Sequence, residues 1–262
     1  MANFKIDLFL NSLHRSASFE MYIPNDPIEN ISWEETLRKR TEMKTLILLH
    51  GYTGKAWNWV SEELARKHNL AIVTVNGENG FYLNGLSTGH QYQTMVGEEI
   101  IGYVRQTFGL ATKPENTFLL GFSMGGFGAL HTALAYPETF GKAGAMSSAM
   151  LIHGIAGMKP GEDNGVANYE YYRECFGDLS KVEESDNNPE VLVRRLKAES
   201  RRIPEIYMCC GTEDFLLESN RAFHSFLEEM GVTHIYRESK GIHDMVFWNE
   251  YTEKIIEWMC NS

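Results

Sequence analysis

The sequence predicts an α/β fold: a single domain with a mostly parallel central sheet and helices on both faces. Two observations carry this prediction. Short apolar runs of bulky and β-branched residues recur along the 262 residues, and stretches long enough for helices separate them. Parallel strands are buried on both faces and are joined by helical crossovers, so this alternation is typical of a parallel sheet. A chain of this length is long enough to bury a sizeable core.

The candidate strands come in order along the chain. Two stretches at the start, FKIDLFL (4–10) and SFEMYIP (18–24), predict an antiparallel pair. The apolar runs that follow predict buried strands at 45–50, 70–75, 117–122, 142–147 and 205–210, with THIYRE (233–238) as a further strand. Between them we expect helices near 57–68, 92–108, 124–136, 189–198, 217–230 and 249–260.

Two stretches interrupt the alternation. Residues 76–91 are rich in glycine and asparagine and predict a surface loop. Residues 148–188 form a long connection that carries Tyr169, Tyr171, Tyr172 and Phe176. Because long excursions in a compact domain are often lids or binding loops, we expect a cap- or lid-like insertion at about 148–188 within a single domain of residues 1–262.

Composition excludes several classes of function. The formal net charge is −11 with no basic run, which argues against a nucleic-acid or membrane partner. Lys5 and Asp7 interrupt the first apolar stretch, so we expect no signal peptide, and no apolar run is long enough for a transmembrane helix. The four cysteines form no C-x-x-C pair, which favours reduced thiols in a cytoplasmic protein over a metal or redox site.

A Gly-x-Ser-x-Gly motif occurs twice, at Gly121–Gly125 and at Gly85–Gly89. A nucleophile elbow needs a strand before the serine and a helix with small residues after it. Ser123 follows the strand TFLL and precedes Gly125, Gly126, Gly128 and Ala129, whereas Ser87 lies in the glycine-rich loop. We therefore expect Ser123 to be the nucleophile and Ser87 to be an ordinary turn serine.

Such a serine needs a histidine that removes its proton, and the expected chain order is serine, acid, histidine. His243 lies in a turn between the last strand and the final helix, where a loop can bring its ring over the sheet edge. His153, in the long insertion, is the main competitor. His131 and His224 suit surface or packing roles on helices, and His234 lies within a strand.

The acid is expected at the carboxyl end of a strand, where α/β sheets gather their chemistry. Asp214 directly follows the strand EIYMCC. Asp244 is the alternative, but adjacent side chains seldom face each other, so it is expected to cap the following helix. The less favoured candidates are Glu213, Asp178 and Asp186.

An oxyanion hole needs two backbone N–H groups aimed at the developing charge. The amide of Met124, directly after the nucleophile, is expected to be one of them. The loop HGYTG (50–54) that follows a strand supplies the amide of Tyr52. His50 in the same loop is expected to be a packed, structural histidine.

The motifs LLHGYTG, GFSMGGFGAL, CGTEDFL and GIHDMVFW, in this order and spacing, resemble the esterase D-like branch of the α/β-hydrolase superfamily. Within it, the chain is most similar to small bacterial tributyrin and acetyl esterases, and the resemblance covers nearly the whole sequence. It implies the α/β-hydrolase fold and catalytic roles for Ser123, Asp214 and His243. Many relatives have tryptophan after the His-Asp pair, where this chain has Met245; Trp248 matches a later aromatic residue expected to line the acyl pocket.

The resemblance implies a serine carboxylesterase that hydrolyses short acyl esters, acetyl to butyryl, with acetylated sugars as natural substrates. It implies a small ester as the partner and neither cofactor nor metal, in line with the absence of a phosphate-binding glycine motif. Tyr82 and His90 are candidate wall residues of the site. Feruloyl esterase, S-formylglutathione hydrolase and acyltransferase activities remain alternatives, as does a binding protein without activity, and a homo-oligomer remains open.

Overall fold

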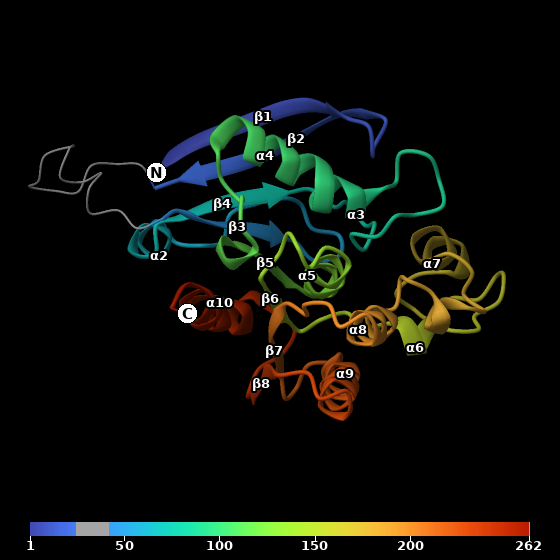
Figure 1. The fold of residues 1–262 in the computed structure, drawn as a ribbon. Helices are drawn as coiled ribbons and strands as arrows, with labels where there is room; N and C mark the ends of the chain where they lie inside the picture. Colours follow the sequence, from blue (N-terminus) through green and yellow to red (C-terminus); the bar gives the residue numbers. More distant parts are fainter. Residues whose placement is uncertain (25–41, 262) are drawn as a thin grey trace, which may run out of the picture.

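The computed structural model describes residues 1–24 and 42–261. These residues form one eight-stranded sheet in the order β1-β2-β4-β3-β5-β6-β7-β8 (Figure 1). The strands are β1 (Ala2–Leu10), β2 (Arg15–Ile23), β3 (Lys44–Leu49), β4 (Leu70–Val75), β5 (Thr117–Phe122), β6 (Lys142–Met146), β7 (Glu205–Gly211) and β8 (His234–Ser239). β1 pairs antiparallel with β2, and β2 with β4, while all later neighbours are parallel. The predicted fold class and the predicted order of the strands along the chain are confirmed.

The helical segments lie between these strands, except for the last, which follows β8. They are α2 (Glu62–Lys67), α3 (Tyr92–Thr94), the π-helix η1 (Met95–Ile100), α4 (Ile101–Phe108), η2 (Pro114–Asn116), α5 (Met124–Ala135), α6 (Ile152–Ile155), α7 (Tyr169–Phe176), η3 (Val182–Glu184), α8 (Pro189–Ala198), α9 (Leu217–Glu229) and α10 (Met245–Cys260). Within the described part of the chain, no helix has both the length and the apolar character that a membrane span requires.

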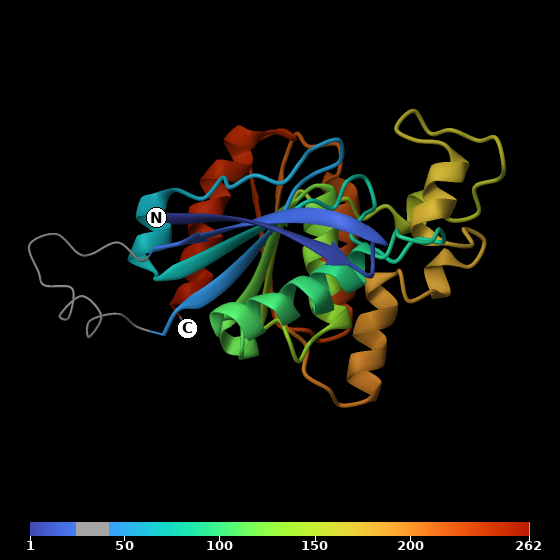
Figure 2. The same ribbon diagram turned by 90° about the horizontal axis from the view of Figure 1, so that it is seen from above.

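Each face of the sheet carries its own apolar core. Successive side chains of a strand point to opposite faces, so Ile47 and Leu49 join the core beneath α4, α5, α8 and α9. Leu46 and Leu48 join the core beneath α2 and α10. Figure 2 shows α10 and α4 on opposite sides of the strands. The helices on both faces leave the carboxyl ends of the parallel strands as the accessible edge.

Two helices begin at residues other than those predicted from the sequence. The helix expected near 57–68 begins only after Ser61, whose hydroxyl oxygen accepts the Leu64 amide at 3.2 Å. Ahead of it, the Asn58 side chain accepts the Val60 amide at 2.9 Å, a local bond that competes with the helical hydrogen bonds. The final helix begins at Met245, four residues earlier than expected, because Asp244 caps it.

The insertion at 148–188 contains α6, α7 and η3. It lies beyond the carboxyl ends of the parallel strands, beside the loop 76–91 (Figure 1). Both stretches that interrupt the strand–helix alternation therefore lie at the same edge of the sheet. This is the edge at which parallel α/β sheets bind their ligands.

Candidate active site

Ser123 lies at the sharp turn between β5 and α5. Its backbone has φ 56° and ψ −122°, a conformation that side chains rarely adopt and that indicates local strain. A Cβ atom on Gly121 would lie 2.1 Å from the carbonyl oxygen of Gly125, and one on Gly125 would lie 1.9 Å from that of Leu49. The two glycines of the motif are therefore required by close backbone contacts, and the predicted strand–turn–helix is present.

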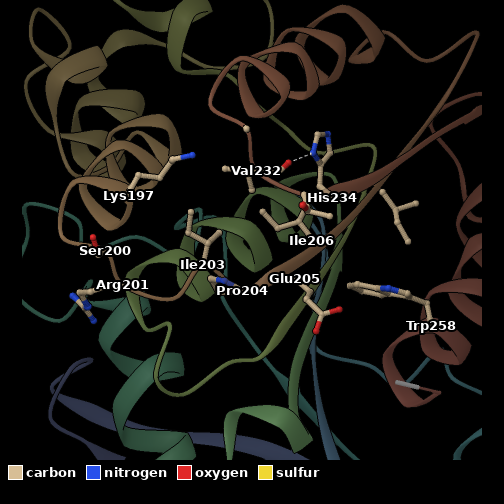
Figure 3. A pocket seen from close by; sticks show the side chains of 13 residues that line it. Lys197, Ser200, Arg201, Ile203, Pro204, Glu205, Ile206, Val232, His234 and Trp258 are labelled. Carbon is tan, nitrogen blue, oxygen red and sulfur yellow. Dashed lines mark hydrogen bonds between the residues drawn. The ribbon is translucent and has the colours of Figure 1, made fainter.

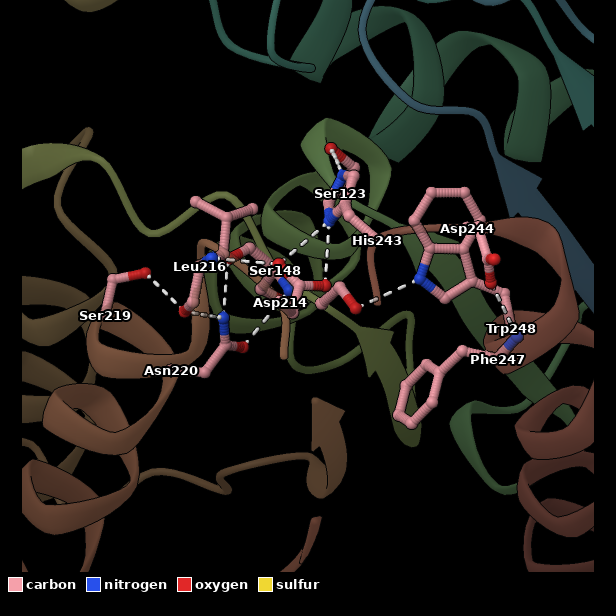
Figure 4. A network of polar contacts seen from close by, with 11 residues as sticks. Ser123, Ser148, Asp214, Leu216, Ser219, Asn220, His243, Asp244, Phe247 and Trp248 are labelled. Carbon is pink, nitrogen blue, oxygen red and sulfur yellow. Dashed lines mark hydrogen bonds and ion pairs between the residues drawn. The ribbon is translucent and has the colours of Figure 1, made fainter. Parts of the chain in front are cut away.

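Three side chains from distant parts of the sequence meet above this turn (Figure 4). Nε2 of His243 lies 2.9 Å from Oγ of Ser123, which is 120 residues away. Nδ1 of the same ring lies 2.9 and 3.1 Å from the two carboxylate oxygens of Asp214. The carboxylate holds the ring proton on Nδ1, so the lone pair on Nε2 faces the serine hydroxyl. This arrangement can withdraw the proton from Ser123.

Asp214 follows β7, and its side chain is inaccessible to solvent. Burial by itself raises the pKa of a carboxyl group. Hydrogen bonds from His243, from the Leu216 amide at 2.8 Å and from Ser147 outweigh the burial and hold the pKa of Asp214 below its ordinary value. Asp214 is therefore held as the anion that an imidazolium at His243 needs.

Trp248 supports His243 from the side away from the cavity. Its ring meets the His243 ring edge to face, with centroids 4.8 Å apart, and stacks on Phe122 at 4.3 Å. Its indole N–H donates to the Ser147 hydroxyl at 3.0 Å. Trp248 is buried, and it is not among the residues that line the cavity. Its position is that of a support for the histidine, which corrects the expected place in the acyl pocket.

The competing acid and histidine lie elsewhere. His153 is exposed, with its ring between the carboxylates of Glu183 and Glu190. Asp244 accepts the Phe247 amide at 3.0 Å as the cap of α10, as expected. Of the less favoured acids, Asp178 bonds its own turn and Asp186 pairs with Arg195, while Glu213 is exposed.

Tyr52 and Met124 both line the cavity at Ser123. Among the described residues, neither N–H donates to another protein group. Met124 is the first residue of α5, where helical N–H groups have no partner within the helix and carry partial positive charge. His50 holds the neighbouring loop: it is buried and its Nε2 accepts the Gly77 amide at 3.1 Å. The amides of Tyr52 and Met124 are therefore available as hydrogen-bond donors beside Ser123.

A cavity of about 350 Å³ opens above Ser123 and His243. Its remaining lining is largely apolar and aromatic: Tyr52, Phe81, Met124, Ala149, Leu151, Asn164, Val166, Tyr171, Tyr172, Phe215 and Leu216. Six of these, Ala149, Leu151, Asn164, Val166, Tyr171 and Tyr172, belong to the insertion at 148–188. The aromatic residues of the insertion were the only local signal in the sequence for this wall, and nothing singled out Phe81 or Phe215.

The two wall residues expected from the loop 76–91 do not reach the cavity. Tyr82 is fully buried, and its hydroxyl donates to the carbonyl oxygen of His50 at 3.2 Å. This bond ties Tyr82 to the loop that carries Tyr52. His90 is exposed and bonds Glu174 on α7. Phe81, the residue before Tyr82, does line the cavity. The sequence analysis therefore predicted the correct loop as part of the cavity wall but not the correct residue.

A buried amide ties the strand ends together (Figure 4). The Asn220 side chain accepts the Ser148 amide at 3.1 Å and donates to the carbonyl oxygens of Ser148 and Leu216. The amide of Ala149, the next residue, donates to the carbonyl oxygen of Ser123 at 3.0 Å. Asn220 thereby fixes the segment after β6 against the turn that carries the nucleophile.

A larger groove of about 680 Å³ lies at the other end of β7 and β8 (Figure 3). Its lining includes Lys197, Arg201, His234 and Trp258. Lys197 donates to the carbonyl oxygen of Met230, and Nδ1 of His234 donates to that of Val232 at 2.8 Å. No serine–histidine contact occurs among its described lining residues. The contact between Ser123 and His243 lies at the smaller cavity.

The geometry agrees with the comparisons to known proteins. Residues 31–256 match the family described as "Putative esterase". An acetyl esterase of Caldicellulosiruptor saccharolyticus is 38% identical over 99% of this chain and 98% of the relative. The fluorophosphonate-binding serine hydrolase F of Staphylococcus aureus shares 25% identity with a TM-score of 0.83, covering 100% and 99% of the two chains. The S-formylglutathione hydrolase FrmB of the same organism shares 26% identity with a TM-score of 0.80, covering 99% and 98%. The chain thus belongs to the esterase family, whose members are serine hydrolases of the α/β-hydrolase fold.

Proposed function

We propose that the chain is a serine carboxylesterase in which Ser123 is the nucleophile, His243 the general base and acid, and Asp214 the carboxylate that orients the imidazole. The observation that carries this proposal is the continuous set of contacts from Oγ of Ser123 through both nitrogens of His243 to Asp214, each 3.1 Å or shorter. The strained elbow at Ser123 presents the hydroxyl openly to the cavity.

The reaction divides into two transfers of the acyl group. Oγ of Ser123 attacks the ester carbonyl carbon while Nε2 of His243 takes the hydroxyl proton. As the tetrahedral intermediate collapses, the imidazolium gives this proton to the departing alcohol, and the acyl group remains on Ser123. Water then attacks the acyl-enzyme, again losing a proton to Nε2, and the carboxylic acid leaves as Ser123 regains its proton.

The amides of Tyr52 and Met124 are proposed to stabilise the oxyanion of each tetrahedral intermediate. Both residues line the cavity, and neither N–H has an acceptor among residues 1–24 and 42–261. Donors fixed before the reaction cost no reorganisation when the charge develops, and one such donor contributes about 10²–10³ in kcat.

The proposed substrates are short acyl esters, acetyl to butyryl, with acetylated sugars as the natural class. The cavity volume of about 350 Å³ is near the lower end for ligand sites. Phe81, Tyr171 and Tyr172 contribute aromatic rings to the lining of this cavity. The acetyl esterase relative matches essentially the full length of this chain.

We further propose that residues 148–188 act as a cap over the site, because they supply six residues of the cavity lining. The cytoplasm is the proposed compartment, since the four cysteines are free thiols and three of them are buried. A homo-oligomer stays a prediction, which size-exclusion chromatography with light scattering would test.

A substrate panel tests the proposal: 4-nitrophenyl acetate, butyrate and octanoate, methyl ferulate, and an acetylated xylo-oligosaccharide. We expect kcat/KM to be highest for acetate and butyrate and to fall for octanoate and ferulate. Faster turnover of ferulate than of acetate would refute the short-acyl assignment. Product analysis with an added acceptor alcohol distinguishes hydrolysis from acyl transfer. A fluorophosphonate probe should label Ser123, as located by peptide mass spectrometry.

A further inference from the structure

Asn220 occupies a core-facing position of α9 at which its neighbours on the same face are apolar. Phe223 and Leu227, three and seven positions further along the helix, are buried with it. Asn220 is fully buried and is not among the residues that line the cavity at Ser123. Because an apolar side chain would pack on this face without the desolvation cost of a buried amide, helix packing alone does not account for the asparagine.

The hydrogen bonds of Asn220 use the oxygen and both N–H groups of its amide (Figure 4). Oδ1 accepts the Ser148 amide at 3.1 Å, while Nδ2 donates to the carbonyl oxygen of Ser148 at 2.9 Å and to that of Leu216 at 2.8 Å. A primary amide supplies one acceptor and two donors in one plane. Asn220 therefore joins two backbone segments, one at Ser148 and one at Leu216, that are far apart in the sequence.

The segment at Ser148 holds the backbone of the proposed nucleophile. The Ser123 amide donates to the carbonyl oxygen of Met146 at 2.9 Å, and the Ser123 carbonyl oxygen accepts the Ala149 amide at 3.0 Å. Ser148 lies between these two partners, and Asn220 bonds both of its backbone groups. The Asn220 side chain thus fixes residues 146–149, which in turn hold the strained turn at Ser123.

The segment at Leu216 holds the proposed acid. The Leu216 amide donates to Oδ1 of Asp214 at 2.8 Å, and the carbonyl oxygen of the same residue accepts the Asn220 side chain. Only Phe215 separates Leu216 from Asp214 in the chain. Asn220 therefore also fixes the loop that presents the carboxylate to His243.

We infer that Asn220 is a positioning residue for the reaction, which sets the place of the Asp214 carboxylate relative to the turn at Ser123. His243 must bond both partners at once, and its closest contact with each is 2.9 Å. A displacement of about 1 Å caused by a change away from the reacting atoms can lower a rate about 10²-fold. The inference rests on the proposed esterase function of Ser123.

Asn220→Leu and Asn220→Ala test this inference, with Ser219→Ala as the matched control. Leucine keeps approximately the shape of the side chain and alanine leaves a void, but both lose all three hydrogen bonds. The Ser219 hydroxyl donates to the same Leu216 carbonyl oxygen at 2.9 Å, and within the described part of the chain it makes no bond to Ser148. Its removal therefore leaves the bridge between the two segments intact.

For 4-nitrophenyl acetate we expect both Asn220 variants to lower kcat about 10- to 100-fold and to leave KM within about a factor of two, because the cavity lining is unchanged. Ser219→Ala should keep kcat within about a factor of two. In the Asp214→Asn background, Asn220→Ala should lower kcat by a further factor of less than about three, since the place of the carboxylate no longer matters there. Melting curves followed by circular dichroism show whether each variant is folded at the assay temperature.

The outcomes separate positioning from a purely structural role. A variant that melts earlier but keeps the parent kcat would overturn the inference. So would full activity in Asn220→Leu with a loss in Asn220→Ala, because filling the space would then be sufficient. An equal loss in both backgrounds, or an equal loss in Ser219→Ala, would overturn it as well. If Asn220→Leu does not fold, Asn220→Ala decides the question. A parent protein without activity on 4-nitrophenyl acetate would instead overturn the proposed function.

Discussion

The two Gly-x-Ser-x-Gly segments of this chain share a sequence pattern but differ in the backbone conformation and the hydrogen-bond partners of their serines. Ser123 lies at a strained turn between a buried strand and a helix. Ser87 is an exposed residue of the loop 76–91, where its hydroxyl donates to Glu174 at 2.8 Å and its amide donates to the same carboxylate at 2.9 Å. Glycines beside Ser123 prevent backbone clashes below 2.2 Å, whereas a Cβ on Gly85 would meet its nearest atom at 3.0 Å.

The order of the partners explains why only one serine is placed for catalysis. At Ser123 the histidine stands between the serine and the acid. At Ser87 the acid stands in the middle, since His90 bonds Glu174 and not the serine. Burial would raise the pKa of Glu174, but bonds from Ser87 and His90 lower it below its ordinary value. Such a carboxylate is a weak base and does not activate Ser87. The contacts of Ser87 and His90 with Glu174 instead hold α7 against the loop 76–91.

The comparison predicts its largest effect at the two serines. Ser123→Ala should lower kcat for 4-nitrophenyl acetate by about 10⁶, because nucleophilic catalysis is lost. Ser87→Ala, the matched control, should leave kcat within about a factor of two, as expected for a surface hydrogen bond away from the site. Steady-state kinetics measure both. A Ser123→Ala enzyme as active as the parent would refute the proposed mechanism.

The second largest effect on kcat is expected at Asp214, and the matched carboxylate is Glu174. Asp214→Asn should reduce kcat by about 10⁴, because the amide favours the wrong imidazole tautomer at His243. Glu174→Gln keeps the shape of its side chain and should change kcat by less than about threefold, since Glu174 contacts neither the nucleophile nor His243. Equal losses in the two variants would mean that the two clusters do not differ in function.

Stability should distinguish Gly125 of the first motif from Gly85 of the second. Gly125→Ala should lower the free energy of unfolding by about 3–5 kcal/mol, because the new Cβ collides with the Leu49 carbonyl oxygen of the neighbouring strand. Gly85→Ala, where the nearest atoms lie at 3.0 and 3.1 Å in Glu174, should cost about 1 kcal/mol or less. Urea unfolding followed by circular dichroism gives both values. A stable Gly125→Ala protein would contradict the described packing of the elbow.

The smallest expected effect is the pH dependence of the Glu174 cluster. A carboxylate with a lowered native pKa stabilises the fold above its unfolded pKa, and this contribution disappears as pH falls through the native value. At pH 7, Glu174→Gln should lower the free energy of unfolding by about 1 kcal/mol. The difference from the parent should close as pH falls below the ordinary value of 4.5. A gap that is unchanged at low pH would show that the ionised carboxylate contributes nothing.

Several site residues could be anticipated because their signals are local. The turn at Ser123 needs small residues two positions away on either side, and the motif provides Gly121 and Gly125 there. Asp214 and His243 each follow a strand of the parallel sheet, and strand ends meet at one edge. The wall residues were harder to anticipate. Tyr82 was expected in the cavity and its neighbour Phe81 is there, because the backbone of the loop decides which of two adjacent rings faces inward.

Other features have no local signal at all. Asn220 lies within an ordinary amphipathic helix, yet it bonds Ser148, 72 residues away. Phe215 directly follows Asp214, and nothing in the sequence distinguishes it from other turn residues. In the structure its ring lies beside the ring of His243. Residues 57–61 are not helical, because the Asn58 side chain accepts the Val60 amide. The apolar pattern of the sequence, which predicts a helix there, does not show this bond.

The sequence by itself determined the class of fold, the elbow and the chain order of the three residues proposed for catalysis. These follow from hydrophobic periodicity and from backbone conformations that only small residues permit, both of which act between neighbours along the chain. The tertiary structure alone decided which aromatic rings line the cavity and which residues support the nucleophile turn and the His243 ring. Those outcomes depend on the order of strands in the sheet and on contacts across 120 residues, which no nearest-neighbour preference can specify.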